Sequence, residues 1–126
     1  MSTPIGPYTP IVRAGPWLIC SGQLGLHHGG TGGASAPAPV LVEGGAPAQL
    51  AQALSNADRL LRDNGATAGD VVKTTVFVTD MDEYAAVNQV YVTFFGDHRP
   101  ARSVVGVAGL PMGASVEVEL WAYLDR

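Results

Sequence analysis

The segment Ser115–Leu124 constrains the fold of this chain most strongly, because two kinds of residue alternate along it without a break. The apolar series is Val116, Val118, Leu120, Ala122 and Leu124, and the intervening series is Glu117, Glu119, Trp121 and Tyr123. A period of two is typical of a β-strand with one face on a core. The other face combines carboxylates with large aromatic rings, which suits a subunit interface that contains polar sites.

Two amphipathic helices are predicted upstream of this strand. Over Ala46–Asn64, leucine and alanine recur at three- and four-residue steps, and Gly65 supplies a left-handed stop. The second helix is predicted to begin at Asp80, with Glu83 completing a capping box, and to end at Gly96. Its expected apolar face is Tyr84, Val87, Val90 or Tyr91, and Phe94.

Short apolar or β-branched segments before and between these helices predict further strands. They are Trp17–Ser21, Val40–Val42, Val71–Val78 and the segment that follows Pro100. The stretch Gly29–Pro39 consists almost only of Gly, Ala, Ser, Thr and Pro, which is typical of a loop. The order of elements, ββ(β)αβαββ, predicts one α+β domain over residues 1–126 with both helices on one face of the sheet.

Composition narrows the function classes. Hydrophobic residues make up 47% of the 126 residues, charged residues only 14%, and the mean hydropathy is +0.19. So few charges favour an oligomer, which buries additional surface. The net charge is −4, and the seven Lys and Arg residues form no cluster, so nucleic-acid binding is disfavoured.

The cysteine content and the lack of long apolar runs constrain the cellular compartment in which we expect this protein. Cys20 is the single cysteine, so an intramolecular disulfide is impossible; within an apolar strand we expect it to be an inert buried thiol. The N-terminal residues contain no apolar signal segment, and no apolar run approaches the ~20 residues that span a bilayer. We therefore expect a soluble cytoplasmic protein.

Arg102 is the most informative candidate site residue, because it lies within the apolar segment Arg99–Val107, which we expect to be a largely buried strand. A buried guanidinium requires an anion or several acceptors, and its planar donors match a carboxylate in bidentate fashion. One interpretation is a receptor for a small carboxylate substrate. The other is a structural ion pair with Glu117 or Glu119, or an arginine that reaches solvent.

Glu117 is a candidate base. If the strands of Arg102 and Glu117 are neighbours, the two side chains can meet as a cross-strand pair. A carboxylate half-buried between subunits has a tunable pKa and can activate water. The alternative is a pair of solvent-facing glutamates on an edge strand. The other candidates are Glu119, Tyr8, Ser21, Asn88, Tyr91 and the histidines.

No metal, nucleotide or nucleophile motif stands out. Adjacent His27 and His28 point to opposite sides of an extended segment, and neither they nor His98 have further ligands at suitable spacing, so no metal is expected. The glycines of Gly29–Gly33 lack the Gly-Lys-Ser/Thr ending of a phosphate loop. Ser21 is outside a nucleophile elbow.

Eight short motifs occur in one order along the chain. They are PIGPY at Pro4, SGQ at Ser21, Q-x-x-x-A-L-x-N at Gln49–Asn56, VVKTTVFVTDM at Val71, VNQVY at Val87, PARSVV at Pro100, LP at Leu110 and VEVE at Val116. Together they resemble the Rid family (YjgF/YER057c/UK114), and specifically its reactive intermediate deaminase A branch. The resemblance covers essentially the whole chain except residues 24–44.

This resemblance implies a chorismate-mutase-like α+β fold with a mixed sheet, assembled as a homotrimer with three sites between subunits. It implies cofactor-independent hydrolysis of reactive enamines and imines, such as 2-aminoacrylate and 2-iminopropionate, to 2-oxo acids and ammonia. Arg102 would then bind the substrate carboxylate, and Glu117 would position or activate water. Tyr8, Ser21 and Asn88 would line the pocket.

The chain departs from the family pattern at three places. Val104 stands where relatives often have cysteine, so any contact of this residue with substrate would come from its backbone. Residues 24–44 form a longer Gly/Ala/Pro-rich connection that carries His27 and His28, at the expected rim of the pocket, so we expect it to affect substrate range. The approach to the arginine, Asp97–Pro100, is shorter than in many relatives.

Three other functions stay open at this point. The same arginine could serve a non-catalytic module that binds small carboxylates or 2-oxo acids. An endoribonuclease is disfavoured by the acidic balance of the chain. A step in a dedicated pathway is compatible with the fold, since one fold hosts several chemistries.

Overall fold

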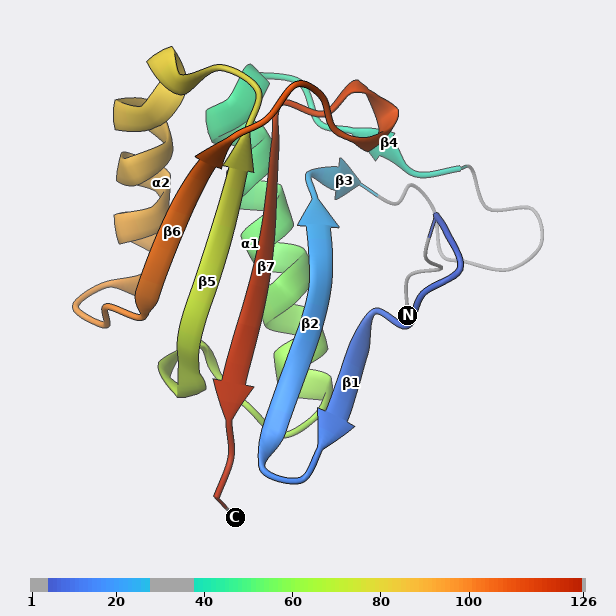
Figure 1. Cartoon of the computed structure of the whole chain (residues 1–126), viewed down its shortest axis with the longest axis vertical. Coiled ribbons are helices and arrows are strands. Elements are labelled where there is room, and N and C mark those ends of the chain that lie inside the picture. Colours follow the sequence, from blue (N-terminus) through green and yellow to red (C-terminus); the bar gives the residue numbers. More distant parts are fainter. Residues whose placement is uncertain (1–4, 28–37, 126) are drawn as a thin grey trace.

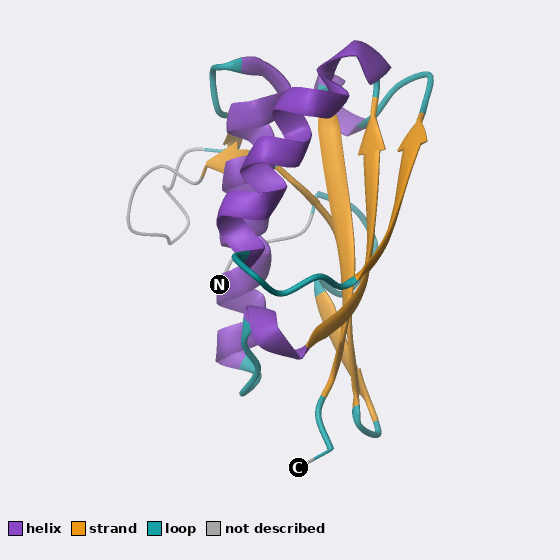
Figure 2. Ribbon diagram, turned by 90° about the vertical axis from the view of Figure 1, so that its left-hand side faces the viewer, coloured by secondary structure: helices purple, strands orange, loops and turns teal. Residues whose placement is uncertain are grey.

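The structure is a computed structural model, and it describes residues 5–27 and 38–125. In it a five-stranded sheet has two helices packed on one face (Figures 1 and 2). His28, and with it most of the predicted loop, lies outside the described residues. In chain order the elements are β1 (Ile11–Ala14), β2 (Trp17–Leu24), β3 (Leu26–His27), β4 (Val40–Leu41), α1 (Gly45–Asp63), η1 (Ala68–Asp70), β5 (Val71–Val78), η2 (Met81–Glu83), α2 (Tyr84–Phe95), β6 (Ala101–Gly106), η3 (Pro111–Gly113) and β7 (Val116–Tyr123).

The sheet is mixed, with strand order β1-β2-β7-β5-β6. Neighbouring strands are antiparallel except β5 and β6, which are parallel and are connected by the crossover helix α2, as parallel strands require. The predicted α+β fold, with both helices on one face of the sheet, is confirmed (Figure 2). A small second sheet pairs β3 with β4 and so joins the two ends of the predicted loop.

The hydrophobic core lies between the helices and the helix-covered face of the sheet. The alternation along β7 is confirmed: every second residue from Val116 to Leu124 is buried. The largest fully buried apolar side chains are Leu18, Leu50, Leu54, Leu61, Leu120, Val71, Val76, Val78, Val87, Val116 and Val118. Burial of each such side chain contributes about 1.5–3 kcal/mol relative to exposure. Thr74 is also fully buried and polar.

The helices differ from prediction mainly at the start of α2. The predicted capping box at Asp80 and Glu83 is wrong: Asp80 accepts a hydrogen bond from the backbone N–H of Asp82 at 2.9 Å and caps the short 3-10 turn η2. This turn places Glu83 at the N-cap position of α2 itself. Tyr84, expected on the apolar face, is 39% exposed. The buried residues of α2 are Val87, Tyr91 and Phe95.

The expectation that the strand of Arg102 is largely buried is wrong. β6 is the edge strand of the sheet, β5 is its single neighbour among the described strands, and four of its six residues are exposed. Apolar β-branched residues on an edge strand have the same sequence signature as a central strand, because burial depends on the neighbours that the topology supplies.

No helix or strand of the described residues covers the face of the sheet opposite the helices, the open face (Figures 1 and 2). Trp121 and Tyr123 of β7 lie on it, and the ring of Trp17 forms edge-to-face contacts with both at centroid distances of 5.8 and 5.1 Å. Other large apolar residues on this face are exposed as well, among them Val12 and Val105. No helix among the described residues combines the length and apolar character that a membrane crossing requires.

Candidate functional site

Arg102 projects from the edge strand β6 toward α2 and is held there by side chains of the helix. Its Nη1 donates a hydrogen bond to Oδ1 of Asn88 at 2.7 Å, and its Nη2 donates to the hydroxyl of Tyr84 at 3.2 Å. The guanidinium carbon lies 4.8 Å from the ring centroid of Tyr91 and 5.7 Å from that of Tyr84, within cation–π range. We call these four residues the arginine cluster.

The cluster leaves part of the guanidinium available. Among the residues that the structure describes, no carboxylate forms an ion pair with Arg102, and two of its five N–H donors have side-chain acceptors. The alternative of a structural ion pair with Glu117 or Glu119 is therefore wrong. A partly buried, oriented guanidinium with free donors is suited to binding an anion.

Arg102 and Glu117 do not form the predicted cross-strand pair. Strand β5 lies between β6 and β7. Arg102 is in register with the fully buried Thr74, on the helix-covered face, whereas Glu117 is in register with Phe77, on the open face. The prediction assumed that strands consecutive in sequence are neighbours, but the parallel crossover places β6 at the edge and returns β7 to the middle of the sheet.

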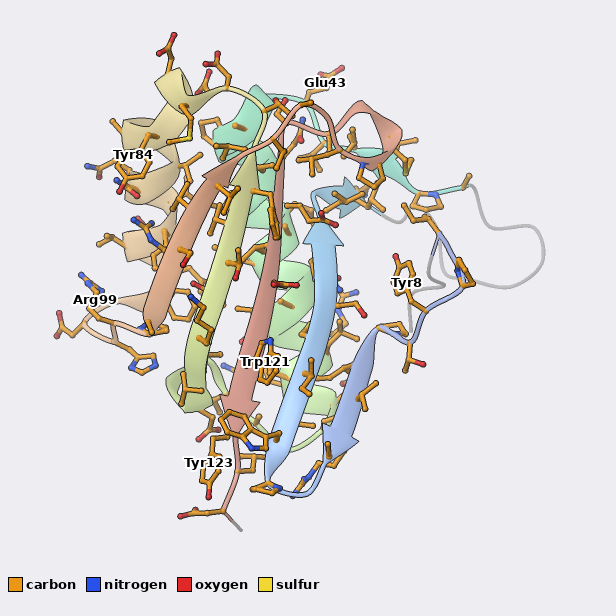
Figure 3. All side chains as sticks on the ribbon, in the orientation of Figure 1. Tyr8, Glu43, Tyr84, Arg99, Trp121 and Tyr123 are labelled. Atoms are coloured by element: carbon orange, nitrogen blue, oxygen red, sulfur yellow. The ribbon has the colours of Figure 1, made fainter. Side chains whose placement is uncertain are left out.

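Glu117 instead lines a cavity of about 370 Å³ at the other side of the molecule. The lining residues are Ile5, Gly6, Pro7, Tyr8, Ser21, Gly22, Leu24, Pro111 and Glu117. The structure thus brings together three of the predicted site residues, Tyr8, Ser21 and Glu117. Tyr8 belongs to this cavity and Tyr84 to the arginine cluster. The two residues lie at opposite edges of the sheet (Figure 3). We call this second feature the glutamate cavity.

Two local features shape the glutamate cavity. The hydroxyl of Ser21 donates a hydrogen bond to the carbonyl of Thr9 at 2.6 Å, which fixes the segment that carries Tyr8. The β2–β7 register shifts between Cys20 and Gln23, and the bulge contains Gly22. A Cβ at Gly22 would lie 2.5 Å from Oε2 of Glu117, so the glycine leaves room for the carboxylate.

The carboxyl group of Glu117 has a perturbed protonation equilibrium. Burial raises its pKa above the ordinary value for glutamate, and the negative charge of Glu119, two residues along the same strand face, raises it further. A raised pKa brings a carboxyl group closer to the range in which it both accepts and donates protons near neutral pH.

Polar residues of α1 hold the rim of the cavity in place. Oε1 of Gln49 accepts a hydrogen bond from the backbone N–H of Ser115 at 2.8 Å, just before β7. Nδ2 of Asn56 donates to the carbonyls of Leu24 and Leu26 at 3.3 and 3.0 Å. These contacts account for the polar residues of the Q-x-x-x-A-L-x-N motif, which support the site rather than line it.

Sequence reasoning identified Asn88 and Tyr91 but missed Tyr84 and Thr74. Tyr84, Asn88 and Tyr91 are spaced i, i+4 and i+7, so a helix places them on one side, and this spacing is a signal that the sequence contains. Thr74 had no such signal, because its position beside Arg102 depends on the parallel register of β5 and β6. Val104 lies on β6, partly buried against the core and two residues beyond Arg102.

The remaining candidates have other surroundings. The described residues contain no group of three or more His, Cys, Asp and Glu that could hold a metal ion. His27 is exposed, and Nε2 of His98 lies 2.7 Å from the carbonyl of Val71. Cys20 is 2% exposed, and burial raises the pKa of its thiol to about 12, as expected for an inert thiol.

Comparison with known proteins is consistent with this architecture. The profile of the family described as Endoribonuclease L-PSP matches residues 1–124. The chain belongs to this family. It is also known as the Rid or YjgF family, so the resemblance read from the eight motifs is confirmed.

Individual relatives of the Rid family cover nearly the full chain. A 2-iminobutanoate/2-iminopropanoate deaminase of Escherichia coli is 39% identical over 118 residues, which are 91% of this chain and 85% of that protein. The crystal structure of RidA from the Antarctic bacterium Psychrobacter sp. superposes with a TM-score of 0.85 at 34% identity and covers 97% of this chain and 92% of that one. The yjgF gene product of E. coli has a TM-score of 0.81 at 37% identity, with coverages of 98% and 91%.

Proposed function

We propose that this protein hydrolyses reactive 2-imino acids, and the enamines from which they form by tautomerisation, to 2-oxo acids and ammonia. The observation that carries the proposal is the oriented guanidinium of Arg102, which has free donors and no carboxylate partner among the described residues. Relatives at 38–39% identity are named 2-iminobutanoate/2-iminopropanoate deaminases, which supports the same reaction class.

Arg102 would bind the carboxylate of the substrate. The side-chain contacts to Asn88 and Tyr84 orient the guanidinium, so little additional ordering is needed when the carboxylate binds. Anchoring one end of a small substrate fixes the distance and direction of its C2 atom from the surrounding groups, which lowers the barrier to attack by water.

Glu117 would manage the protons. As a carboxylate it accepts a proton from water while the water oxygen bonds to C2 of the protonated imine, giving a tetrahedral carbinolamine. The carboxyl group then returns the proton to the amino nitrogen. The C2–N bond breaks with its electron pair on nitrogen while the Glu117 carboxylate takes up the remaining hydroxyl proton, so that ammonia and the 2-oxo acid leave. Glu117 then releases this proton to solvent. An iminium carbon is already electrophilic, so the scheme calls for no cofactor.

We further propose that each complete site forms between two copies of the chain in a homotrimer. Arg102 and Glu117 lie on opposite faces of the sheet, so one chain does not direct both at the same substrate. The open face of the sheet, with its exposed Trp121, Tyr123 and Val105, provides the apolar surface that an interface requires. A second copy that covers this face could bring its arginine cluster to the glutamate cavity.

The proposal is tested by generating imino acids in solution with an amino-acid oxidase and trapping them with semicarbazide. Wild-type protein should accelerate imine loss and reduce semicarbazone yield, whereas Arg102→Ala should have no effect at the same concentration. Imines from alanine, 2-aminobutanoate and leucine would map the side chains that are accepted.

Two other results would favour different functions. Saturable binding of 2-oxobutanoate without turnover of any imino acid would favour a carboxylate-binding module. RNA cleavage that survives stringent purification and does not depend on Arg102 would favour a ribonuclease, in spite of the net charge of −4. In either case the deaminase proposal would be wrong.

A further inference from the structure

A buried hydroxyl pair lies directly behind the arginine cluster. Thr74 of β5 is fully buried and in parallel register with Arg102. Its Oγ1 lies 2.7 Å from the hydroxyl oxygen of Tyr91, which is 4% exposed. The pair therefore joins the strand next to Arg102 to the helix that faces it.

The ring of Tyr91 connects this pair to the guanidinium. Its centroid is 4.8 Å from Cζ of Arg102, the closer of the two aromatic rings at the arginine. The same ring also packs on Phe95, with 4.7 Å between centroids. Thr74 thus holds the hydroxyl of Tyr91 and Phe95 packs against its ring, while the same ring contacts the guanidinium of Arg102.

Stability alone explains this pair poorly. An interior hydrogen bond between neutral groups contributes about 1 kcal/mol net, and an apolar pair of the same shape stabilises a core about equally well. A hydroxyl pair differs from an apolar pair in direction, because it fixes the position of the phenol oxygen and with it the direction of the ring axis of Tyr91. Burial raises the pKa of the Tyr91 phenol above its ordinary value, so the hydroxyl stays protonated well beyond neutral pH.

We infer that Thr74 and Tyr91 are positioning residues for Arg102: their hydrogen bond fixes the aromatic surface that holds the guanidinium in its anion-binding orientation. This inference rests on the proposed function, because it assigns the oriented guanidinium to the substrate carboxylate. It extends the site from the helix surface to a buried residue of the sheet that touches no substrate.

The test uses Thr74→Val, Tyr91→Phe and the double variant in the full-length protein. Each single variant should weaken binding of 2-oxobutanoate and raise KM for the imino acid about 3- to 10-fold, with kcat within about twofold. Thr74→Val should also lower Tm, because it leaves the buried phenol of Tyr91 without a partner. Thr93→Val is the matched control, since that threonine is exposed on α2 and bonds only to the helix backbone.

The double variant separates positioning from stability. With both hydroxyls absent no buried polar group is left unpaired, so Tm should recover while the binding of 2-oxobutanoate stays weak. Recovery of binding together with Tm would mean that the pair is only structural, and the inference would be wrong.

A readout without substrate keeps this inference distinct from the proposed function. The NMR signal of the Nε–H of Arg102, assigned with Arg102→Lys, should be sharp in the wild type and broadened in both single variants. An unchanged signal would overturn the inference even in an active deaminase. A lack of turnover by the wild type would overturn the proposed function. The NMR signal of Arg102 and the affinity for 2-oxobutanoate would then still decide whether Thr74 and Tyr91 position the guanidinium.

Discussion

Arg102 and Glu117 lie on opposite faces of one sheet, with strand β5 between their strands. The arginine is held by side chains of α2, and the glutamate lines a cavity near β2 and the segment that carries Tyr8. Each group has the surroundings of a site residue, yet a single chain keeps them apart. This arrangement leads to a direct experiment on assembly.

Mixing two inactive variants should restore activity. Arg102→Ala retains the glutamate cavity, and Glu117→Gln retains the arginine cluster. If each site takes one half from each of two neighbouring copies, random 1:1 assembly gives about one quarter of the sites both intact halves. We expect activity near that fraction of wild type after the variants are unfolded together and refolded.

Two controls make the mixing experiment decisive. The variants refolded separately and then combined without exchange should stay inactive, and sedimentation should give the mass of three chains. If the refolded mixture is inactive although its trimers contain both variants, the arginine cluster of one copy does not act with the glutamate cavity of another. A monomer in sedimentation would contradict the homotrimer.

Arg102 should be far more sensitive to substitution than other arginines. Arg102→Ala should lower kcat/KM by about 30-fold to several thousand-fold, because truncation of one partner in a buried charged contact costs about 2–5 kcal/mol. Arg102→Lys should recover little, since an ammonium lacks the planar pair of donors. Steady-state kinetics with unchanged circular dichroism would establish this.

Arg62 is the matched control for Arg102. It is an exposed arginine of α1 whose Nε donates to Asp58 at 2.9 Å, one helical turn earlier. Such surface pairs contribute about 0.3–0.5 kcal/mol to stability. Arg62→Ala should therefore leave kcat/KM unchanged, and an equal loss in both variants would contradict the assigned role of Arg102.

Gly22→Ala should impair chemistry more than folding. The added Cβ would lie 2.5 Å from Oε2 of Glu117, and the flexible end of that side chain can move away at low cost in stability. A displaced carboxylate no longer meets the water at the correct position, so we expect kcat to fall at least about tenfold. Gly69→Ala is the control, because its nearest contact, the hydroxyl of Thr67, is an ordinary 3.6 Å away.

The stability of Glu117→Gln relative to wild type should depend on pH. The pKa of Glu117 is raised in the folded protein, chiefly by burial, so the folded state binds its proton more tightly than the unfolded state. The contribution of Glu117 to stability is then most favourable below the unfolded pKa and is lost as the pH rises through the folded pKa.

Urea titrations of both proteins from pH 4 to pH 8 would measure this effect. Glu117→Gln should gain stability relative to wild type as the pH rises, and the difference should level off above the folded pKa of Glu117. A difference that does not change with pH would mean that Glu117 has the same pKa in the folded and unfolded chain.

Periodicity in the sequence is sufficient to predict the main elements. The alternation along Ser115–Leu124 predicts which residues of β7 are buried, and the leucine and alanine spacing over Ala46–Asn64 predicts α1 to within one residue at each end. Both patterns depend on local geometry, since a strand repeats every two residues and a helix every 3.6. The eight motifs that resemble the Rid family are also short local runs, so they can be recognised in the sequence without the structure.

The capping box at Asp80 and the burial of the Arg102 strand were predicted incorrectly for different reasons. The first depends on whether one turn is 3-10 or α-helical, a small difference in energy that tertiary contacts decide. The second depends on strand order, which leaves β6 at the edge of the sheet.

The sequence by itself determined which side chains are present for the proposed chemistry: one arginine in an apolar strand, one glutamate on an alternating strand, and an asparagine on a helix. Only the tertiary structure decided where they lie. It joins Arg102 to Asn88 through a 2.7 Å hydrogen bond, places the ring of Tyr91 against the guanidinium and Thr74 in register with it, and places Glu117 on the opposite face. The physical reason is that side-chain identity and periodicity are local properties, whereas strand order and register arise from how the whole chain buries its apolar surface.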